Sequence, residues 1–318
     1  MKLTCMQLLT VAFLATLVTM SSAALQYNFY SSSCPSAEET IKSKVNYLIN
    51  GNPSVAAALI RLLFHDCFVT GCDGSILLDG SSSEKSAIPL AVAGYNAVDA
   101  IKAAVESECP GTVSCADILA FAARDAVNRS AGYYYAVNSG RRDLNSSTSI
   151  SILTNMPTPR FSIQDLVARF AQKNLNIVDL VALSGAHAIG VAHCSSVSNR
   201  LYPSVDPTMD PAYAADLKQR CPSSGVPDNL LNNSAVSPTV LDNQYFKNVV
   251  ARRVLFTSDA ALLNRNDTAA KVAEMAADPA KWIAQFAASM VKMGSINVTT
   301  GTQGQVRTSC RKINSPVN

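Results

Sequence analysis

The stretch at residues 61–68 reads Arg61-Leu62-Leu63-Phe64-His65-Asp66-Cys67-Phe68. Its apolar residues favour a helix, and residues four apart on a helix lie one above the other on the same face. Arg61 and His65 therefore share a face. A guanidinium keeps its charge at every working pH, whereas an imidazole can take up and return a proton near neutral pH. The pair predicts a site that holds a fixed positive charge beside a proton shuttle, which suits the splitting of a polar bond.

An isolated Arg and His at this spacing are more often structural, but the surrounding string is far more specific. Residues 55–79 resemble the distal helix and following loop of the secreted plant haem peroxidases, the horseradish peroxidase family. The resemblance implies a mostly α-helical fold in which two helical lobes, distal and proximal, enclose a haem b, with very little β-structure. It also implies that Arg61 and His65 face the haem iron, with Phe64 limiting access to the distal pocket.

The first 25 residues have the features of an export signal. Lys2 precedes an apolar run at residues 8–17, which is too short to span a bilayer comfortably, and small residues follow at 22–24. Cleavage after Ala24 and cleavage after Leu25 both remain open. We therefore expect a signal peptide at residues 1–25 and one haem peroxidase domain at residues 26–318. Loss of Lys2 lowers the formal charge from +3 to +2, too weak and dispersed for nucleic-acid binding.

The cysteines outside the signal are even in number, which in an exported chain predicts disulfides rather than a metal site. Spacing alone allows roughly a hundred pairings of eight cysteines. Zinc is the alternative, although the chain has no Cys-x2-Cys. The resemblance selects four pairs: Cys34 with Cys109, Cys67 with Cys72, Cys115 with Cys310, and Cys194 with Cys221.

Periodicity in the remainder of the chain is mainly helical. Ser114, with Asp117 at the third helical position, predicts a helix start, and that apolar run ends near Gly132. Further helices are expected after Ser162 and over residues 278–294. Only residues 133–137 look like a strand.

A second informative string, residues 179–187, is an apolar helix that ends in Ser-Gly beside His187. An imidazole at the edge of an apolar wall suits an axial haem ligand, although an isolated case is more often a buried structural histidine. The string resembles the proximal motif of the family, which implies that His187 binds the iron. The resemblance also makes Asp259, in Thr257-Ser258-Asp259, the acceptor that orients His187 from the second shell.

The same resemblance supplies the reaction and the reductants. His65 would take a proton from hydrogen peroxide and return it to the leaving oxygen, while Arg61 stabilises the developing charge. Small phenolic reductants would then give up single electrons, with the carbonyl of Pro157 orienting them. Arg160 stands where the family commonly has an aromatic residue, so we expect a preference for anionic phenolic acids.

Calcium needs six to eight oxygen ligands, including carboxylates. The family's distal calcium ligands correspond to Asp66, Val69, Gly71, Asp73 and Ser75, so we expect one calcium ion there.

The second calcium site is doubtful. Its ligands map to Ala188, Ser234, Ser237, Val240 and Asp242. Ala188 lacks the usual threonine hydroxyl and Ser234 replaces the usual aspartate, so we expect this site to be weak or empty.

Another departure from the family lies near the distal histidine. Leu90 stands where the family has the asparagine that accepts a hydrogen bond from that histidine, and the following loop looks two residues short. Leucine cannot accept this bond, so we expect slower activation of peroxide with the reaction type unchanged.

These features predict a secreted, monomeric haem peroxidase of the apoplast or cell wall, without membrane attachment after signal removal. Sequons at Asn128, Asn145, Asn232, Asn266 and Asn297 agree with a secreted glycoprotein. Two alternatives remain: a haem-binding wall protein with degraded turnover, and a metal-dependent hydrolase built on His65 and Asp66. The sequence does not identify the physiological reductant.

Overall fold

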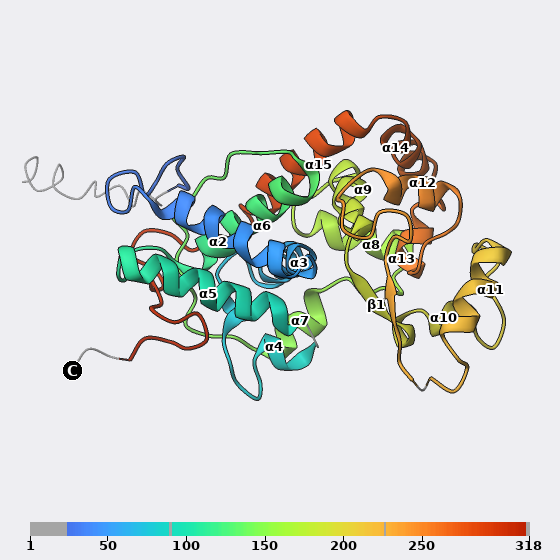
Figure 1. Cartoon of the computed structure of the whole chain (residues 1–318), viewed down its shortest axis with the longest axis horizontal. Coiled ribbons are helices and arrows are strands. Elements are labelled where there is room, and N and C mark those ends of the chain that lie inside the picture. Colours follow the sequence, from blue (N-terminus) through green and yellow to red (C-terminus); the bar gives the residue numbers. More distant parts are fainter. Residues whose placement is uncertain (1–23, 89–90, 226, 316–318) are drawn as a thin grey trace, which may run out of the picture.

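The computed structural model describes residues 24–88, 91–225 and 227–315, and these are mostly helical (Figure 1). Nearly all of the expected signal at residues 1–25 lies outside the described residues, and so does Leu90. The α-helices are α2 (Ala37–Gly51), α3 (Ser54–Val69), α4 (Glu84–Ala87), α5 (Val92–Glu108), α6 (Cys115–Ala131), α7 (Ser149–Asn155), α8 (Ile163–Ala171), α9 (Ile177–Ser184), α10 (Ser198–Leu201), α11 (Pro211–Arg220), α12 (Gln244–Val250), α13 (Thr257–Ala261), α14 (Asn266–Ala277) and α15 (Pro279–Met293). Short 3-10 helices are η1 (Ser75–Leu77), η2 (Gly185–Ala188) and η3 (Cys194–Ser196).

The helices form two groups that follow the chain order (Figure 1). Helices α2 to α7 lie in one lobe and α8 to α14 in the other, while α15 contacts both α9 and α3. One buried apolar cluster runs through both lobes, and a smaller one lies around α10 and α11. The expected mostly α fold is therefore confirmed.

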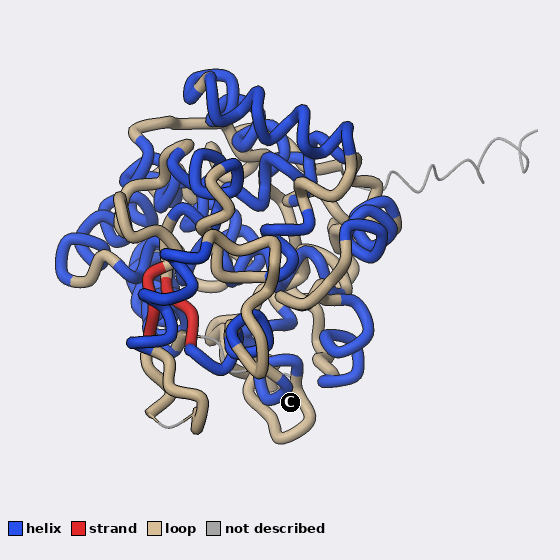
Figure 2. The backbone as a smooth tube through the Cα atoms, turned by 90° about the vertical axis from the view of Figure 1, so that its right-hand side faces the viewer, coloured by secondary structure: helices blue, strands red, loops and turns tan. Residues whose placement is uncertain are grey.

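The β-structure is one short antiparallel pair, β1 (Val191–His193) with β2 (Leu230–Asn232), in the described part of the chain. Figure 2 shows it as a small ribbon at one side of the molecule. The prediction of a strand at residues 133–137 was wrong, because no neighbouring segment pairs with it there. Tyr135 and Val137 are buried whereas Tyr134 and Ala136 are exposed, so the alternation reflects an extended segment lying on the helical core.

Helix ends form where local side chains satisfy free backbone groups. Ser114 Oγ accepts from Asp117 N at 3.1 Å, and α6 ends at Gly132 with φ 68°. Such a left-handed residue is favourable for glycine because it has no Cβ. Ser162 starts α8 with a capping box, and Asp278 caps α15. The predicted starts of these helices are confirmed.

Four disulfides link the elements in the pairing that the resemblance implies: Cys34–Cys109, Cys67–Cys72, Cys115–Cys310 and Cys194–Cys221.

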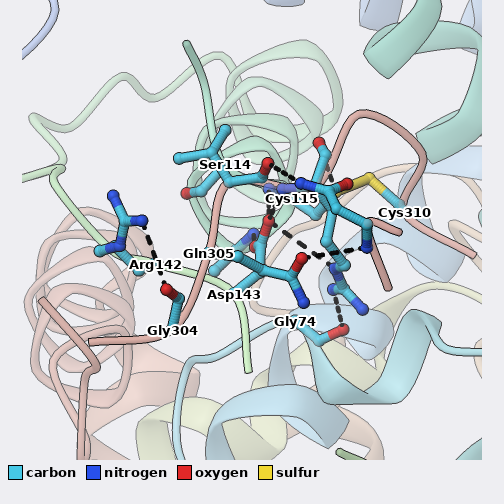
Figure 3. A network of polar contacts seen from close by, with 12 residues as sticks. Gly74, Ser114, Cys115, Arg142, Asp143, Gly304, Gln305 and Cys310 are labelled. Carbon is cyan, nitrogen blue, oxygen red and sulfur yellow. Dashed lines mark hydrogen bonds and ion pairs between the residues drawn. A yellow bond between two sulfur atoms is a disulfide. The ribbon is translucent and has the colours of Figure 1, made fainter. Parts of the chain in front are cut away.

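A buried polar network fixes the loop that follows α3 (Figure 3). Asp143 accepts from the backbone N–H groups of Cys115 and Ala116 at 3.1 and 2.9 Å, so its charge lies at the N-terminus of α6. It also accepts from Arg307 N at 2.8 Å, and the Arg307 side chain donates to the Gly74 carbonyl at 2.5 Å. The C-terminal segment, α6 and the Gly74 loop are thereby held together.

Candidate active site

Helix α3 has one open face, which carries Arg61, and buried His65 lies directly beneath Arg61. Arg61 is exposed and Phe64 is half-buried, whereas most other residues of α3 are buried. His65 is only 4% exposed, and its Nε2 accepts a hydrogen bond from Arg61 Nε at 3.2 Å. The two side chains expected to act together therefore touch. Phe64 packs on Phe68 with ring centroids 4.9 Å apart and meets the His65 ring edge-on at 5.8 Å.

The environment of His65 keeps its ring neutral. Burial, followed by the positive charge of Arg61, lowers the pKa of His65 to about 3. The other ring nitrogen, Nδ1, is buried and has no hydrogen-bond partner in the described part of the chain. Buried polar atoms normally have a hydrogen-bond partner. Among the described residues, no hydrogen bond at Nδ1 fixes the orientation of the His65 ring or raises its basicity.

His187 lies on η2, directly after α9, and α9 begins with a capping box of Asn176 and Asp179. Gly185 allows close approach of the last turn to Trp282, because a Cβ there would lie 2.6 Å from the indole Nε1. The His187 side chain is 42% exposed although the helix before it is mostly buried. Its Nδ1 lies 2.9 Å from Oδ1 of Asp259, which is buried on α13. Two residues 72 apart in sequence are thus brought into contact, as the resemblance implied.

The open face of α3 adjoins the segment that follows His187. Ala57 lies on the same face as Arg61 and Phe64, at helical spacings of four and three. A Cβ built on Gly190 would lie 3.2 Å from Ala57 Cβ, so the backbone three residues after His187 passes directly beside this face. The backbone just after His187 therefore runs beside the face of α3 that carries Arg61.

The Pro157 segment lies close to Asp259. Ser258 N donates to the Pro159 carbonyl at 3.0 Å, which holds residues 157–159 against α13. Pro157 is half-buried, and its carbonyl accepts no hydrogen bond from the described residues. Arg160 is exposed.

Among the residues expected to bind the first calcium, the carboxylates are buried and close together. Asp66 accepts from Gly74 N at 2.9 Å, and Asp73 accepts from Ser75 N at 2.9 Å. Burial and then the charge of Asp73 raise the pKa of Asp66 well above its usual value, and burial also raises that of Asp73. Such a cluster is stabilised by a cation. The Val69 carbonyl accepts from Lys173 Nζ at 2.7 Å, and a Cβ on Gly71 would collide with the Asn297 carbonyl at 2.4 Å.

Sequence reasoning missed Glu84, which belongs to the same cluster. It is fully buried on α4, and its Oε2 accepts from Ser75 Oγ at 3.1 Å. Burial and then the charge of Asp73 raise the pKa of Glu84 to about 7. In the described part of the chain no three His, Cys, Asp or Glu side chains are arranged to hold a metal by themselves. The expected calcium set instead combines two carboxylates with a hydroxyl and carbonyl groups.

The residues mapped to the second calcium site are brought only partly together. Ser237 Oγ donates to Asp242 Oδ1 at 3.1 Å, and Ser237 N donates to Ser234 Oγ at 3.4 Å. Ala188 is buried on η2 and offers no side-chain oxygen, while Val240 is 46% exposed. The mapped positions contain one carboxylate, Asp242.

A family model described as "Peroxidase" matches residues 41–278. The chain is 45% identical to Peroxidase 3 of Arabidopsis thaliana over 313 residues, covering 95% of this chain and 96% of that protein. It is 44% identical to Peroxidase 1 of Oryza sativa subsp. japonica over 322 residues (96% and 98%). It is also 44% identical to Peroxidase 5 of Vitis vinifera over 306 residues (92% of each).

With this fold and these matches, the chain belongs to the plant peroxidase family, whose members are haem enzymes. It is a haem peroxidase that uses hydrogen peroxide and a reductant. The residues present fit a haem: His187 Nδ1 is held by Asp259, so the partly exposed ring keeps Nε2 available, which is the donor that haem iron takes.

Proposed function

We propose that this peroxidase is a secreted enzyme that oxidises phenols, with His187 as the iron ligand and with Arg61 and His65 acting on peroxide. The observation that carries the proposal is the 3.2 Å contact between Arg61 Nε and a neutral His65 Nε2 on the open face of α3. A neutral imidazole beside a fixed positive charge is a base next to an anion-stabilising group.

When bound, the haem supplies the iron that takes peroxide and the oxidising capacity that is passed to the reductant. His65 accepts the peroxide proton at Nε2, after peroxide has displaced the Arg61 hydrogen bond from that atom. It then returns the proton to the leaving oxygen, which departs as water. Arg61 donates hydrogen bonds to that oxygen as negative charge develops on it. Such acid–base and electrostatic help is typically worth about 10²–10⁴-fold each.

On the opposite side, Asp259 orients His187 and draws on its Nδ1 proton, which makes Nε2 a stronger donor. Replacement of His187 by alanine should abolish the ligand and most of the haem affinity.

The reductant is proposed to bind near Pro157. Its carbonyl accepts no hydrogen bond from the described residues, so it can accept the phenol O–H and hold the ring beside the segment that packs on α13. Each phenol gives up one electron and one proton, so two phenols and one peroxide yield two phenoxyl radicals and two waters. Exposed Arg160 would favour phenolic acids. Equal turnover of ferulate and its neutral methyl ester would contradict this preference.

The distal calcium site is proposed to bind one ion through Asp66, Asp73 and Ser75 side chains and the Val69 and Gly71 carbonyls. The crowding of buried carboxylates supports it. A second ion is proposed to bind weakly or not at all, because Ser237 and Asp242 bond to each other and Ser234 brings no charge.

Export to the apoplast or cell wall is proposed from the N-terminal 25 residues and the disulfides. No helix in the described ranges is long and apolar enough to cross a bilayer. We propose a monomer in solution, which sedimentation of the holoprotein would test.

Stopped-flow mixing of the holoprotein with hydrogen peroxide, followed by guaiacol, tests the function directly. Wild type should react rapidly and oxidise guaiacol. His65→Ala should slow the peroxide step by about 10²–10⁴-fold while the haem absorption remains. Equal rates in the two proteins would overturn the assignment of His65.

A further inference from the structure

We propose that Tyr245 is a positioning residue that weakens the pull of Asp259 on the iron ligand His187. This inference rests on the proposed roles of His187 and Asp259 and adds a residue to them. One carboxylate oxygen of Asp259 accepts two hydrogen bonds. Asp259 Oδ1 lies 2.9 Å from His187 Nδ1 and accepts from the Tyr245 hydroxyl at 2.8 Å.

The surroundings fix the direction of the second bond. Tyr245, on α12, is 3% exposed, and burial followed by the charge of Asp259 raises its pKa well above 10. The contact is a hydrogen bond donated by the phenol O–H, because the carboxylate of Asp259 can only accept. Its ring meets the His187 ring nearly edge-on, with centroids 6.1 Å apart and an interplanar angle of 77°.

Two donors on one oxygen share its electron density. The stronger the bond from the phenol, the less basic Oδ1 is toward the Nδ1 proton of His187. The imidazole then has less imidazolate character, and its Nε2 is a weaker donor to the metal. Tyr245 therefore moderates the effect of Asp259, and α12 becomes part of the support of the iron ligand.

The test is resonance Raman spectroscopy of the ferrous holoprotein, with the iron–histidine stretching band as the readout, and the ferric/ferrous reduction potential as a second one. In Tyr245→Phe the band should shift to higher frequency and the potential should fall, because Asp259 Oδ1 then accepts a hydrogen bond from His187 alone. Asp259→Asn should shift both in the opposite direction. Tyr213→Phe is the matched control: it removes a hydroxyl from a buried tyrosine of the smaller core cluster, and neither readout should move.

A second variant keeps both the aromatic ring and its hydroxyl. A 2,3-difluorotyrosine at position 245 keeps the ring and donates a stronger hydrogen bond, so the band should shift to lower frequency. An unchanged band in both position-245 variants, or shifts of the same sign, would overturn the role of Tyr245. Failure of the proposed function looks different: the band would then be missing from wild type or would persist in His187→Ala.

Discussion

At the residue scale, the proposed distal site depends on a histidine, His65, that must be neutral to act as a base. His65 is buried, and Arg61 touches it, so protonation of its ring is opposed both by desolvation and by a like charge. Its role as a base follows from this surrounding rather than from the residue type. The same surrounding leaves Nδ1 without a hydrogen-bond partner among the described residues.

The rate of the peroxide step should therefore be independent of pH over most of the acid range. In the proposed mechanism neutral His65 is the active form. Burial and the Arg61 charge lower its pKa to about 3, so the rate should fall only as pH approaches that value. In Arg61→Leu the loss of the like charge should raise the pKa of His65, so the fall in rate on the acid side of the pH–rate profile should move to higher pH. Stopped-flow pH jumps, which expose the protein to acid for milliseconds, measure this. A midpoint near the ordinary histidine value, about 6.5, would contradict it.

Leu90→Asn should accelerate the same step by about tenfold, if the new amide accepts the Nδ1 proton of His65. Leu90→Ala is the control, since it removes the leucine without supplying an acceptor, and it should not be faster than wild type. The second-order rate constant with hydrogen peroxide is the measurement. An unchanged rate in Leu90→Asn would count against the importance of the missing acceptor.

At the element scale, the two lobes differ in how well their loops are prepared for a cation. The loop after α3 is held by the Cys67–Cys72 disulfide and by Arg307. Asp73 in this loop and Asp66 in the last turn of α3 are both buried. The segment from Ser234 to Asp242 carries one carboxylate, which already accepts a hydrogen bond from Ser237. Ligand charge and loop anchoring therefore both favour the first of the two proposed calcium sites.

Wild type dialysed against a low-calcium buffer should retain one calcium ion per chain by metal analysis. Ser234→Asp adds a second carboxylate and should raise the affinity of the second site, whereas the neutral Ser234→Asn should not. Two ions retained by wild type would contradict the weak second site.

Sequence patterns predicted the elements whose signals are local. The caps at Ser114 and Ser162 depend on residues three positions apart, and these helices start as predicted. The strand prediction at residues 133–137 failed because an extended apolar segment needs a partner, and pairing is not a local property. Glu84 and Tyr245 were missed for the same reason, since each contacts its site only through the tertiary fold. The His187–Asp259 contact was predicted only through family resemblance.

At the scale of the whole molecule, disulfides hold together segments that are far apart in the sequence. Cys115 at the start of α6 is bonded to Cys310, 195 residues later, beside the Asp143 and Arg307 network (Figure 3). The C-terminal segment thereby supports the Gly74 loop, where the distal calcium site is proposed.

Replacing Cys115 and Cys310 by alanine should lower the free energy of unfolding by about 5 kcal/mol, because a long loop is released in the unfolded chain. The same change at Cys67 and Cys72, which enclose a short loop, should cost about 2 kcal/mol by the same entropy estimate. Denaturant unfolding of both variants measures the difference. A larger loss for the short loop would show that native-state contacts outweigh chain entropy here.

The most direct measurement is a crystal structure of the holoprotein. We expect the haem iron bonded to His187 Nε2, with Arg61 and His65 on the opposite face of the porphyrin and Asp259 still bonded to His187 Nδ1. A porphyrin bound elsewhere, or an iron held by a residue other than His187, would contradict the assignment of the active site.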